Sequence, residues 1–380
     1  MKIFHISDIH LGKKLSGYSL IEDQKYILNQ ILENIKTEKP AVLMIAGDIY
    51  DTSNPSVEAV ELFDYFLSEL NKIEITVLII SGNHDQASRL AFGKSIFSKN
   101  NIIIASEYKG KLEKYTAENV NFYMLPFIRP YNVREFCPNR EIATYNDAVK
   151  FALEEVEEND DVNILMAHQF VSGSAVSDSE VQSVGGLDAI DKEVFKKFDY
   201  VALGHLHKEQ GFDDNKIRYC GSPLKYSFSE VNNKNSITVI DVNDKDKYDI
   251  KISTILLKPL IGMLDIEGKI DDITSSAYLN SIDSNAYVRI KLTDDGAVYN
   301  PISRLSQCYS HFVTLKMDNS FVPTVQDCVL SSDELEKIDP IEVFTKLYKH
   351  KRDGNELKEE ESKLINDLIG KVWGEKNENN

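Results

Sequence analysis

The sequence is poor in cysteine and has no long apolar run. Its four cysteines stand at positions 137, 220, 308 and 328, and none belongs to a CxxC pair of the kind found in zinc or redox sites. We therefore expect reduced, structural thiols. The longest apolar runs, such as residues 41–46 and 76–80, are much shorter than the roughly 18 residues of a membrane span. No membrane partner is expected.

The sequence also lacks an excess of basic residues. It contains 43 Lys and Arg against 61 Asp and Glu, a net charge of −18. This excludes a protein that holds nucleic acid by general basicity, because phosphate contacts need gathered Lys and Arg. A local nucleic-acid site remains compatible with the charge. The first residues are strand-like and show no signal peptide, so we predict a cytoplasmic protein.

The 380 residues are enough for two or three domains. In the first 210 residues, five short apolar runs alternate with amphipathic stretches, notably residues 20–35 and 57–70, whose apolar positions follow a helical period. This alternation is typical of βαβ units and predicts an α/β domain. The five strand-like runs are residues 3–7, 41–46, 76–80, 162–167 and 201–203.

Beyond these runs the pattern changes to strands without helices between them. Residues 216–220, 236–242 and 249–257 predict a second, mainly antiparallel sheet. Lys258-Pro259 ends it, since proline interrupts a strand ladder, and we place the first domain at 1–257.

Two further regions follow. Residues 258–330 mix strands with a helix near 273–279 and predict a small α+β capping domain. Asp339-Pro340 has a capping acid and a proline suited to a first helical turn, so residues 331–380 are expected to form a C-terminal helix pair. Its apolar stripes either pack on the preceding domain or dock on a partner helix.

Each of the five predicted strands ends in side chains that can bind a metal. Because the carboxyl ends of strands in an α/β sheet share one edge, we expect these side chains to converge. Within Asp8-Ile9-His10 and His205-Leu206-His207 the spacing of two places both side chains on one face of an extended chain. The full set is Asp8, His10, Asp48, Asn83, His84, His168, His205 and His207.

A lone buried histidine is more often a hydrogen-bonded core residue than a ligand, but five strand ends of this kind together indicate a metal site. Imidazole, carboxylate and amide donors suit Mn²⁺, Fe²⁺ or Zn²⁺ and are too rich in nitrogen for Ca²⁺. Even seven of these donors are too many for one ion. Two ions roughly 3.5 to 4 Å apart would use them and would suit phosphoester hydrolysis.

The series DxH, GDxxD, GNHD, H and GHxH resembles the calcineurin-like metallophosphoesterase superfamily. This resemblance implies a four-layer α/β/β/α sandwich over a two-metal site, so that residues 1–257 would form the metallophosphoesterase domain. Three stretches are also similar to nuclease subunits of the bacterial SbcCD family. They are SGNHD at 81–85, VALGHLH at 201–207 and GSPLKYSFSE at 221–230.

The superfamily resemblance implies a role for each strand-end residue. The first ion would be held by Asp8, His10, Asp48 and His207. The second would be held by Asp48, Asn83, His168 and His205, with Asp48 bridging the two. His84 would face the scissile phosphate as acid or charge stabiliser. Asp51 would orient it, and an acid beside the imidazole would favour its protonated form.

The nuclease-family resemblance implies a DNA nuclease subunit that uses two divalent ions, most often Mn²⁺, with Mg²⁺ or Fe²⁺ as alternatives. It implies 3′ to 5′ exonuclease action on duplex ends and endonuclease action on hairpins or single strands, in DNA repair and recombination. The expected partner is an SbcC-like coiled-coil ATPase, with the chain as a homodimer inside a heterotetramer.

Two other functions stay open. One is a phosphoesterase for a small phosphodiester or cyclic nucleotide, which would have the same basic fold. The other is a non-catalytic scaffold. The length beyond residue 257 favours the nuclease over the first alternative, and the complete set of ligands argues against the second.

Contacts to DNA are harder to assign from the sequence. Lys13, Lys14 and Arg89 are candidates for the phosphate backbone, together with Arg129 and Arg134. Each is equally compatible with a solvated surface charge. Tyr226 and Phe228 either line the substrate path or pack a loop beneath the site, and we expect the packing role.

Overall fold

The computed structural model describes residues 1–157, 159–177, 188–243, 249–294 and 298–317, with residues 348, 361–365 and 368. The chain divides into two compact units. The first contains Met1–Ile266, Thr274–Arg289 and Ile302–Thr314, and the second contains Glu267–Ile273, Ile290–Pro301 and Leu315–Asn380. Everything that bears on the candidate site lies in the first unit.

The first six-stranded sheet has the order β14-β13-β1-β4-β5-β6. Its parallel part consists of β1 (Lys2–Ile6), β4 (Val42–Ala46), β5 (Thr76–Ile80) and β6 (Ile102–Ala105). The strands β13 (Ser236–Val242) and β14 (Ile250–Leu256) add an antiparallel hairpin at the β1 edge. The sheet is therefore mixed, with the antiparallel hairpin at one edge and the parallel strand β6 at the other.

The second six-stranded sheet has the order β11-β12-β10-β9-β8-β7. The strands β8 (Val120–Leu125), β9 (Val162–His168), β10 (Tyr200–Gly204) and β12 (Ile217–Tyr219) run parallel. The edge strands β7 (Glu113–Ala117) and β11 (Gln210–Phe212) are antiparallel to their neighbours.

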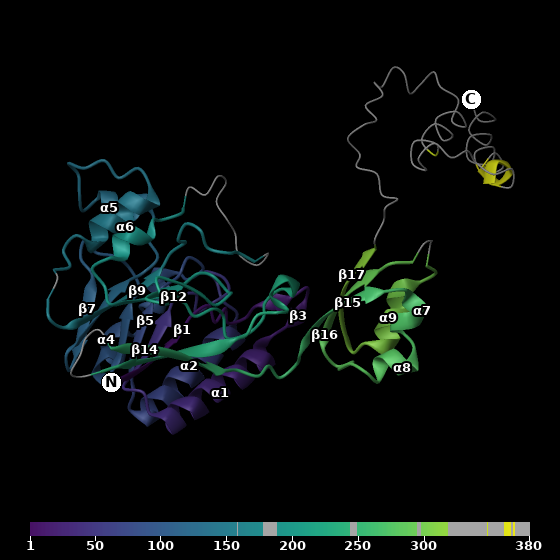
Figure 1. Cartoon of the computed structure of the whole chain (residues 1–380), viewed down its shortest axis with the longest axis horizontal. Coiled ribbons are helices and arrows are strands. Elements are labelled where there is room, and N and C mark those ends of the chain that lie inside the picture. The colour runs from purple at the N-terminus through teal and green to yellow at the C-terminus, as the bar shows by residue number, and fades with distance from the viewer. Residues whose placement is uncertain are drawn as a thin grey trace, which may run out of the picture. The chain divides into compact units, whose positions relative to one another are not determined.

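Alternating side chains of the two sheets build three apolar cores, which makes four layers. On β4, Val42 and Met44 face the second sheet, while Leu43 and Ile45 face the helices α1 (Ile21–Glu38) and α2 (Val57–Ile73). The outer face of the second sheet packs on α6 (Tyr145–Leu153). Figure 1 shows α1 and α2 on one side of the sheets and α5 and α6 on the other. The predicted α/β/β/α arrangement is confirmed.

Short elements complete the first unit. They are β2 (Lys14–Leu15), β3 (Tyr18–Ser19), α3 (Ala87–Leu90), α4 (Lys94–Phe97), η1 (Ser98–Asn100), α5 (Pro130–Arg134), η3 (Lys192–Phe195) and η4 (Phe228–Glu230). The strands β6, β7 and β8 were not predicted, although β8 is buried along its whole length.

One sequence prediction about the sheets is wrong. Residues 216–220, 236–242 and 249–257 were expected to form a sheet of their own, but β12 joins the second sheet and the β13–β14 hairpin joins the first. Pairing with β1 buries β13 almost completely. Strand propensity alone does not say which edge a strand joins, because the partner is set by tertiary packing.

The C-terminal part contains a three-stranded sheet of order β15-β16-β17, formed by β15 (Met263–Gly268), β16 (Tyr287–Leu292) and β17 (His311–Met317). It is accompanied by α7 (Ile270–Ile273), α8 (Ser276–Leu279) and α9 (Pro301–Cys308). The predicted strands 286–292 and 312–317 are confirmed. The predicted helix pair of 331–380 lies almost entirely outside the described residues, and the domain boundaries stay a prediction. Among the described residues, no helix is long and apolar enough to span a membrane.

Candidate metal centre

The predicted ligands come together where strands of both sheets end. Asp8 and His10 follow β1, Asp48 follows β4, and Asn83 follows β5, while His168 ends β9 and His205 and His207 follow β10. The βαβ pattern alone indicated that they would share one sheet edge. In the structure they come from two facing sheets instead. The backbone joins the loops, because the Asp8 N–H donates to Gly47 O at 3.0 Å and the His10 N–H donates to Asp48 O at 3.0 Å.

Several of these residues have a strained backbone. Asp8, His10 and Asp48 have φ values of 54°, 46° and 50°, and His205 has a φ of 103°. Residues with a Cβ rarely adopt such values, and a group of them at one place is held there by the surrounding structure, often at a functional site. The strain therefore supports a site whose side-chain directions matter more than local backbone stability.

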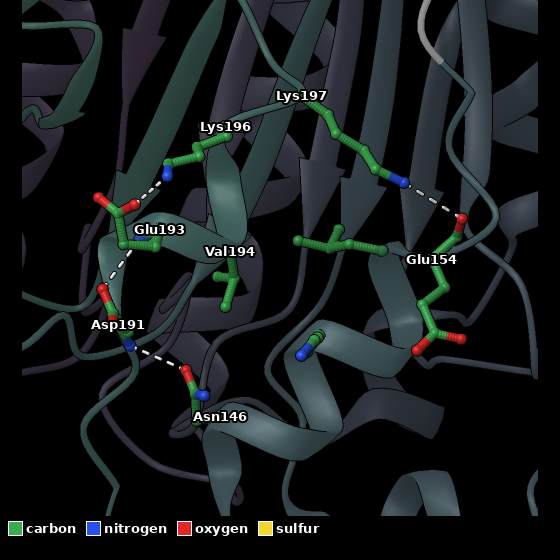
Figure 2. A pocket seen from close by; sticks show the side chains of 9 residues that line it. Asn146, Glu154, Asp191, Glu193, Val194, Lys196 and Lys197 are labelled. Carbon is green, nitrogen blue, oxygen red and sulfur yellow. Dashed lines mark hydrogen bonds and ion pairs between the residues drawn. The ribbon is translucent and has the colours of Figure 1, made fainter.

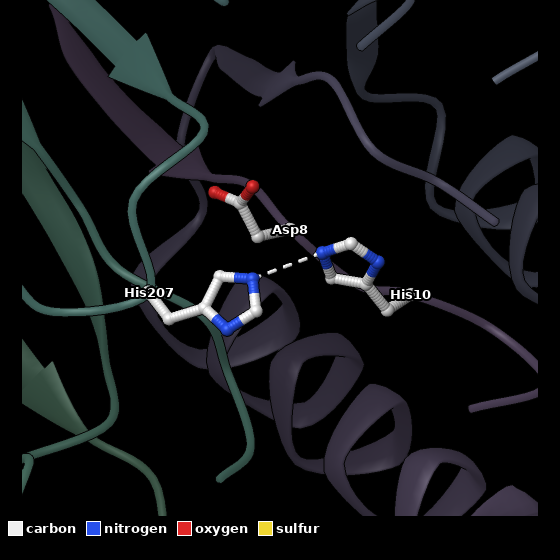
Figure 3. A group of neighbouring side chains, drawn as sticks. All are labelled: Asp8, His10 and His207. Carbon is white, nitrogen blue, oxygen red and sulfur yellow. Dashed lines mark hydrogen bonds between the residues drawn. The ribbon is translucent and has the colours of Figure 1, made fainter. Parts of the chain in front are cut away.

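The first half of the centre consists of Asp8, His10 and His207 (Figure 3). All three side chains are buried, and their potential ligand atoms lie within 4.8 Å of one another. The Nε2 atoms of His10 and His207 are 3.0 Å apart. Nδ1 of His10 is buried and lies 3.5 Å from Oδ1 of Asp51. Two imidazole nitrogens that face each other beside a buried carboxylate are the donors that a divalent cation needs.

The second half consists of Asn83, His168 and His205. The amide oxygen of Asn83 lies 3.1 Å from Nε2 of His168 and 2.9 Å from Nδ1 of His205. Asp48 lies between the halves, since its Oδ2 is 3.3 Å from Nε2 of His168 and 3.6 Å from Nε2 of His10. This is the position that a bridging carboxylate requires.

Glycines let the chain approach this closely. A Cβ at Gly82 would lie 2.1 Å from Oδ1 of Asp48, and one at Gly47 would lie 2.3 Å from Nδ1 of His168. Neither distance is possible for a real side chain. Glycine at these two positions is therefore what allows the close approach of the ligand segments.

Outer contacts fix the direction of the imidazoles. Nδ1 of His207 donates to Oε1 of Glu230 at 3.0 Å, and Nδ1 of His168 donates to Ala46 O at 2.7 Å. In both rings Nε2 is then left to face the centre, which is how histidine ligands are usually oriented. Glu230 is fully buried, and its Oε2 also accepts the Tyr226 N–H at 2.9 Å.

Asp85 organises the loops around Asp48. Its carboxylate accepts the backbone N–H groups of Ile49, Tyr50 and Gly82 at 3.1, 3.0 and 2.9 Å. Sequence reasoning gave no role to Asp85 or Glu230, although both stand inside the motifs that carry the resemblance. The available signal was an acidic residue next to a ligand in the same motif.

Burial and neighbouring charges move the pKa values of the cluster in opposite directions. Burial raises the pKa of Asp8 to about 6 and lowers those of His10 and His205 to about 4 and 3. Burial opposes ionisation of Asp48 as well, but the facing His168 and His10 imidazoles hold its pKa well below the usual value. Neutral imidazoles beside an ionised carboxylate are the protonation states in which these groups bind metal.

The pKa of His168 moves the other way. Burial alone would lower it, but the Asp48 and Asp8 carboxylates outweigh burial and raise it to about 9. A bound cation would take the place of this proton, since metal ligands must be deprotonated. The donor set, the glycine cradle and the oriented imidazoles thus fit a pair of divalent ions.

His84 lies beside the cluster and is half-buried. Its backbone N–H donates to Oδ1 of Asp48 at 2.9 Å, and its Nδ1 donates to the backbone oxygen of Asp51 at 2.7 Å. Asp51 does contact His84, but the predicted carboxylate contact is wrong. The Asp51 carboxylate instead accepts from Lys13 at 2.7 Å and lies 3.5 Å from Nδ1 of His10. Geometry alone also allows His84 as a ligand, because it lies within 4.8 Å of His10 and Asp48.

A separate pocket lies between α6 and η3 (Figure 2). Most of its charged side chains already have partners, since Lys197 donates to Glu154 O and Val156 O at 3.3 and 2.9 Å, and Lys196 pairs with Glu193. The pocket contains none of the predicted site residues. Its groups satisfy one another, and we assign it no chemistry.

The sequence pattern of the family "Calcineurin-like phosphoesterase" matches residues 1–209, which is more than half of the chain. The chain therefore belongs to the calcineurin-like phosphoesterases, and it is a hydrolase of that class. A second pattern, described as "Type 5 capsule protein repressor C-terminal domain", matches residues 260–352.

Among curated proteins, the D subunit of the nuclease SbcCD from Staphylococcus epidermidis (strain ATCC 12228 / FDA PCI 1200) is 35% identical over 374 residues. The match covers 97% of this chain and 98% of that protein. Within its class, the chain thus belongs to the SbcD family of SbcCD nuclease subunits. A dimetal phosphatase from Danio rerio matches 67% of this chain and 95% of its own, with 12% identity and a TM-score of 0.41. TT1561 of Thermus thermophilus matches 68% of this chain and 99% of its own, with 11% identity and a TM-score of 0.39.

Proposed function

We propose that the chain hydrolyses DNA phosphodiester bonds with two divalent ions, as 3′ to 5′ exonuclease on duplex ends and endonuclease on single strands and hairpins. The observation that supports this most directly is the convergence of seven donors from five strand ends around Asp48. Asp8, His10 and His207 would hold one ion and Asn83, His168 and His205 the other, with Asp48 shared. Mn²⁺ is the proposed metal, since the donors mix imidazole with carboxylate and amide oxygen.

The side chains around the centre have separate tasks. When bound, two divalent ions activate water and neutralise charge on the phosphate. Glu230 and the Ala46 carbonyl hold the ligand imidazoles in place through their Nδ1 protons. His84 directs its Nδ1 proton to Asp51 O, which leaves Nε2 to face the phosphate and to carry the proton for the leaving oxygen.

The activity is tested with purified protein on end-labelled duplex, hairpin and single-stranded DNA and on a small phosphodiester, each with Mn²⁺ or EDTA. We expect metal-dependent cleavage of the DNA substrates. Turnover of the small ester alone would favour the first alternative, a small-substrate phosphoesterase. Absence of turnover together with absence of bound metal would favour a scaffold.

The proposed DNA-binding residues differ in the contacts that their side chains make. Lys13 is paired with Asp51 at 2.7 Å, beside His84, which supports the proposed contact with a phosphate at the centre. Lys14 is exposed on β2. Arg89 on α3 donates to Asn54 at 3.2 Å. Arg134 donates to Ile142 O at 2.9 Å, which indicates a structural role.

The proposed protein partner is an SbcC-like coiled-coil ATPase, and residues 331–380 are the proposed docking segment. Deletion of residues 339–380 should abolish association with the ATPase and preserve Mn²⁺-dependent cleavage. Retained association would contradict this assignment. The cytoplasmic location stays a prediction.

The proposed homodimer has a suitable apolar surface in the first unit. Val60 on α2 and Phe92 line one hollow with Tyr50 and Leu90, and Phe92 is 84% exposed. A ring this exposed costs solubility unless another surface covers it. We expect a dimer in sedimentation equilibrium for the wild type and a monomer for Phe92→Glu. A dimer that survives this substitution would place the interface elsewhere.

A further inference from the structure

We propose that Phe127, Phe170 and Arg129 form an aromatic platform that holds one unpaired nucleobase next to the metal centre. This inference rests on the proposed function and deepens it, because it names the form of the substrate that the site accepts. The ligand is a nucleotide whose base is not paired, as in a single strand, a hairpin loop or a frayed duplex end.

The platform adjoins the second half of the centre. The ring of Phe127 has its centroid 6.3 Å from that of His168, and the ring of Phe170 has its centroid 6.3 Å from that of His205. The two imidazoles are themselves neighbours at 5.3 Å. Both phenyl rings are half-buried, so part of each stays open to solvent. A phosphate bound at the centre therefore has open aromatic surface within the reach of its own nucleoside.

Among the described residues, the first half of the centre offers no such surface. Apart from imidazoles, its aromatic neighbour there is Tyr226, whose ring lies 5.4 Å from that of His10 and 5.5 Å from that of His207. Tyr226 is only 3% exposed, and its hydroxyl donates to Ile9 O. The predicted packing role of Tyr226 agrees with this burial. Within the part of the chain that the structure describes, the side of Phe127 and Phe170 is therefore where a base can stack.

Hydrogen bonds hold the segments that carry Phe127 and Phe170 in place. The Phe127 N–H donates to Ser81 O at 2.9 Å, directly before the segment that carries Asn83. The side-chain amide of Gln169 donates to Ile128 O at 3.2 Å. Gln169 is fully buried and stands between His168 and Phe170 in the chain. The positions of both rings are thus set by the same segments that carry two of the proposed ligands, which reduces the entropy cost of binding.

Arg129 adds a positive charge to this surface. Its guanidinium carbon lies 5.1 Å from the centroid of the Phe127 ring, and the residue is exposed. A guanidinium over an aromatic ring is held by a cation–π interaction, and its flat face can itself carry a base or a phosphate. In a protein with a net charge of −18, a local cation of this kind is needed to retain a polyanion.

Stacking on aromatic rings and arginine planes is the usual way in which proteins hold unpaired bases without reading their sequence. A paired base inside a duplex already has both faces covered by its neighbours. The platform therefore selects for unpaired nucleotides and is indifferent to base identity.

The test compares Phe127→Leu with the wild type in two assays. In EDTA, fluorescence titration follows the binding of a single-stranded oligonucleotide that contains 2-aminopurine. With Mn²⁺, KM and kcat are measured on the same strand and on an abasic dinucleotide, a small diester that has no nucleobase and no aromatic ring. We expect Phe127→Leu to weaken binding and to raise the KM for the strand by about 5-fold or more, with the small diester unaffected.

Two matched variants complete the design. Phe127→Tyr keeps the ring and should behave as the wild type. Phe136→Leu removes a half-buried ring that packs on Tyr108 away from the centre and should also have no effect on binding. Wild-type binding by Phe127→Leu, or equal losses on the strand and on the small diester, would overturn the platform. If the wild type cleaves neither substrate, the proposed function fails, and the titration in EDTA still decides the platform separately.

Discussion

The two halves of the metal centre share Asp48 but differ in their surroundings. The first half is closed, since Asp8, His10 and His207 are buried and are backed by Tyr226 and Glu230. The second half is more open, since Asn83 and His205 are half-buried and two half-buried phenylalanines adjoin it. One half is built to hold its ligands in place, and the other adjoins the surface through which a substrate can approach.

The two halves differ because different segments of the chain support them. The first half is supported by a segment from later in the chain, residues 224–230, which links the loops after β1 and β10 through Tyr226 and Glu230. The second half depends on β9 and on the loop after β8. Changes to these two supports should therefore have separable effects.

The largest effect is expected for Asp48→Asn, which breaks both halves at once. The amide cannot replace the carboxylate that lies close to His168 and His10. Metal affinity and activity should fall by more than about 100-fold, above the range typical for the loss of an outer partner. Isothermal titration with Mn²⁺ checks this, and unchanged binding would contradict the bridging role.

His84→Ala should separate catalysis from metal binding. We expect kcat to fall roughly 100-fold or more, as for the loss of a general acid, while metal content stays nearly intact. Metal analysis of the dialysed variant is the measurement. If metal content falls in parallel with activity, His84 is a ligand, as its proximity to His10 and Asp48 also allows.

Glu230→Gln should weaken the first half alone. The amide no longer offers His207 a charged acceptor, and a loss of this kind typically costs about 10 to 100-fold in metal affinity. Titration should show one weakened site and one unchanged site. Glu155→Gln is the control, since the Glu155 carboxylate accepts the Leu112 N–H far along the chain from the centre. Equal weakening of both sites would refute the division into halves.

The smallest effect is expected at the start of α6, on the outer face of the second sheet. The Thr144 side chain caps this helix. Thr144→Ala should lower the free energy of unfolding by about 1 kcal/mol and leave metal binding unchanged. The backbone N–H and hydroxyl of Thr144 lower the pKa of Asp147. The stabilisation from Asp147 is thus present above about pH 4 and lost as the pH falls through its lowered pKa. Urea unfolding at pH 7 and pH 3 measures the loss from Thr144→Ala and the pH-dependent stabilisation from Asp147. If the stabilisation from Asp147 were the same at both pH values, its assigned role at this helix start would be contradicted.

Much of this architecture could be predicted from the sequence, because the strongest signals are local. The runs at 42–46 and 76–80 are apolar, contain β-branched residues and are followed by glycine or by Ser-Gly, so their strands and the ligands after them were predictable. The sheet that β13 joins was not predictable, because β13 pairs with β1, which lies more than two hundred residues earlier in the chain. Asp51 shows a second limit. Its proximity to His84 was foreseen, but only coordinates distinguish a backbone oxygen from a carboxylate.

The central claim is that the two halves each hold one divalent ion. The most direct measurement is the number of Mn²⁺ ions that remain bound per chain after equilibrium dialysis, for the wild type and for His207→Ala and His205→Ala. We predict two ions for the wild type and one for each variant. A single ion in the wild type, or two ions in both variants, would contradict the account.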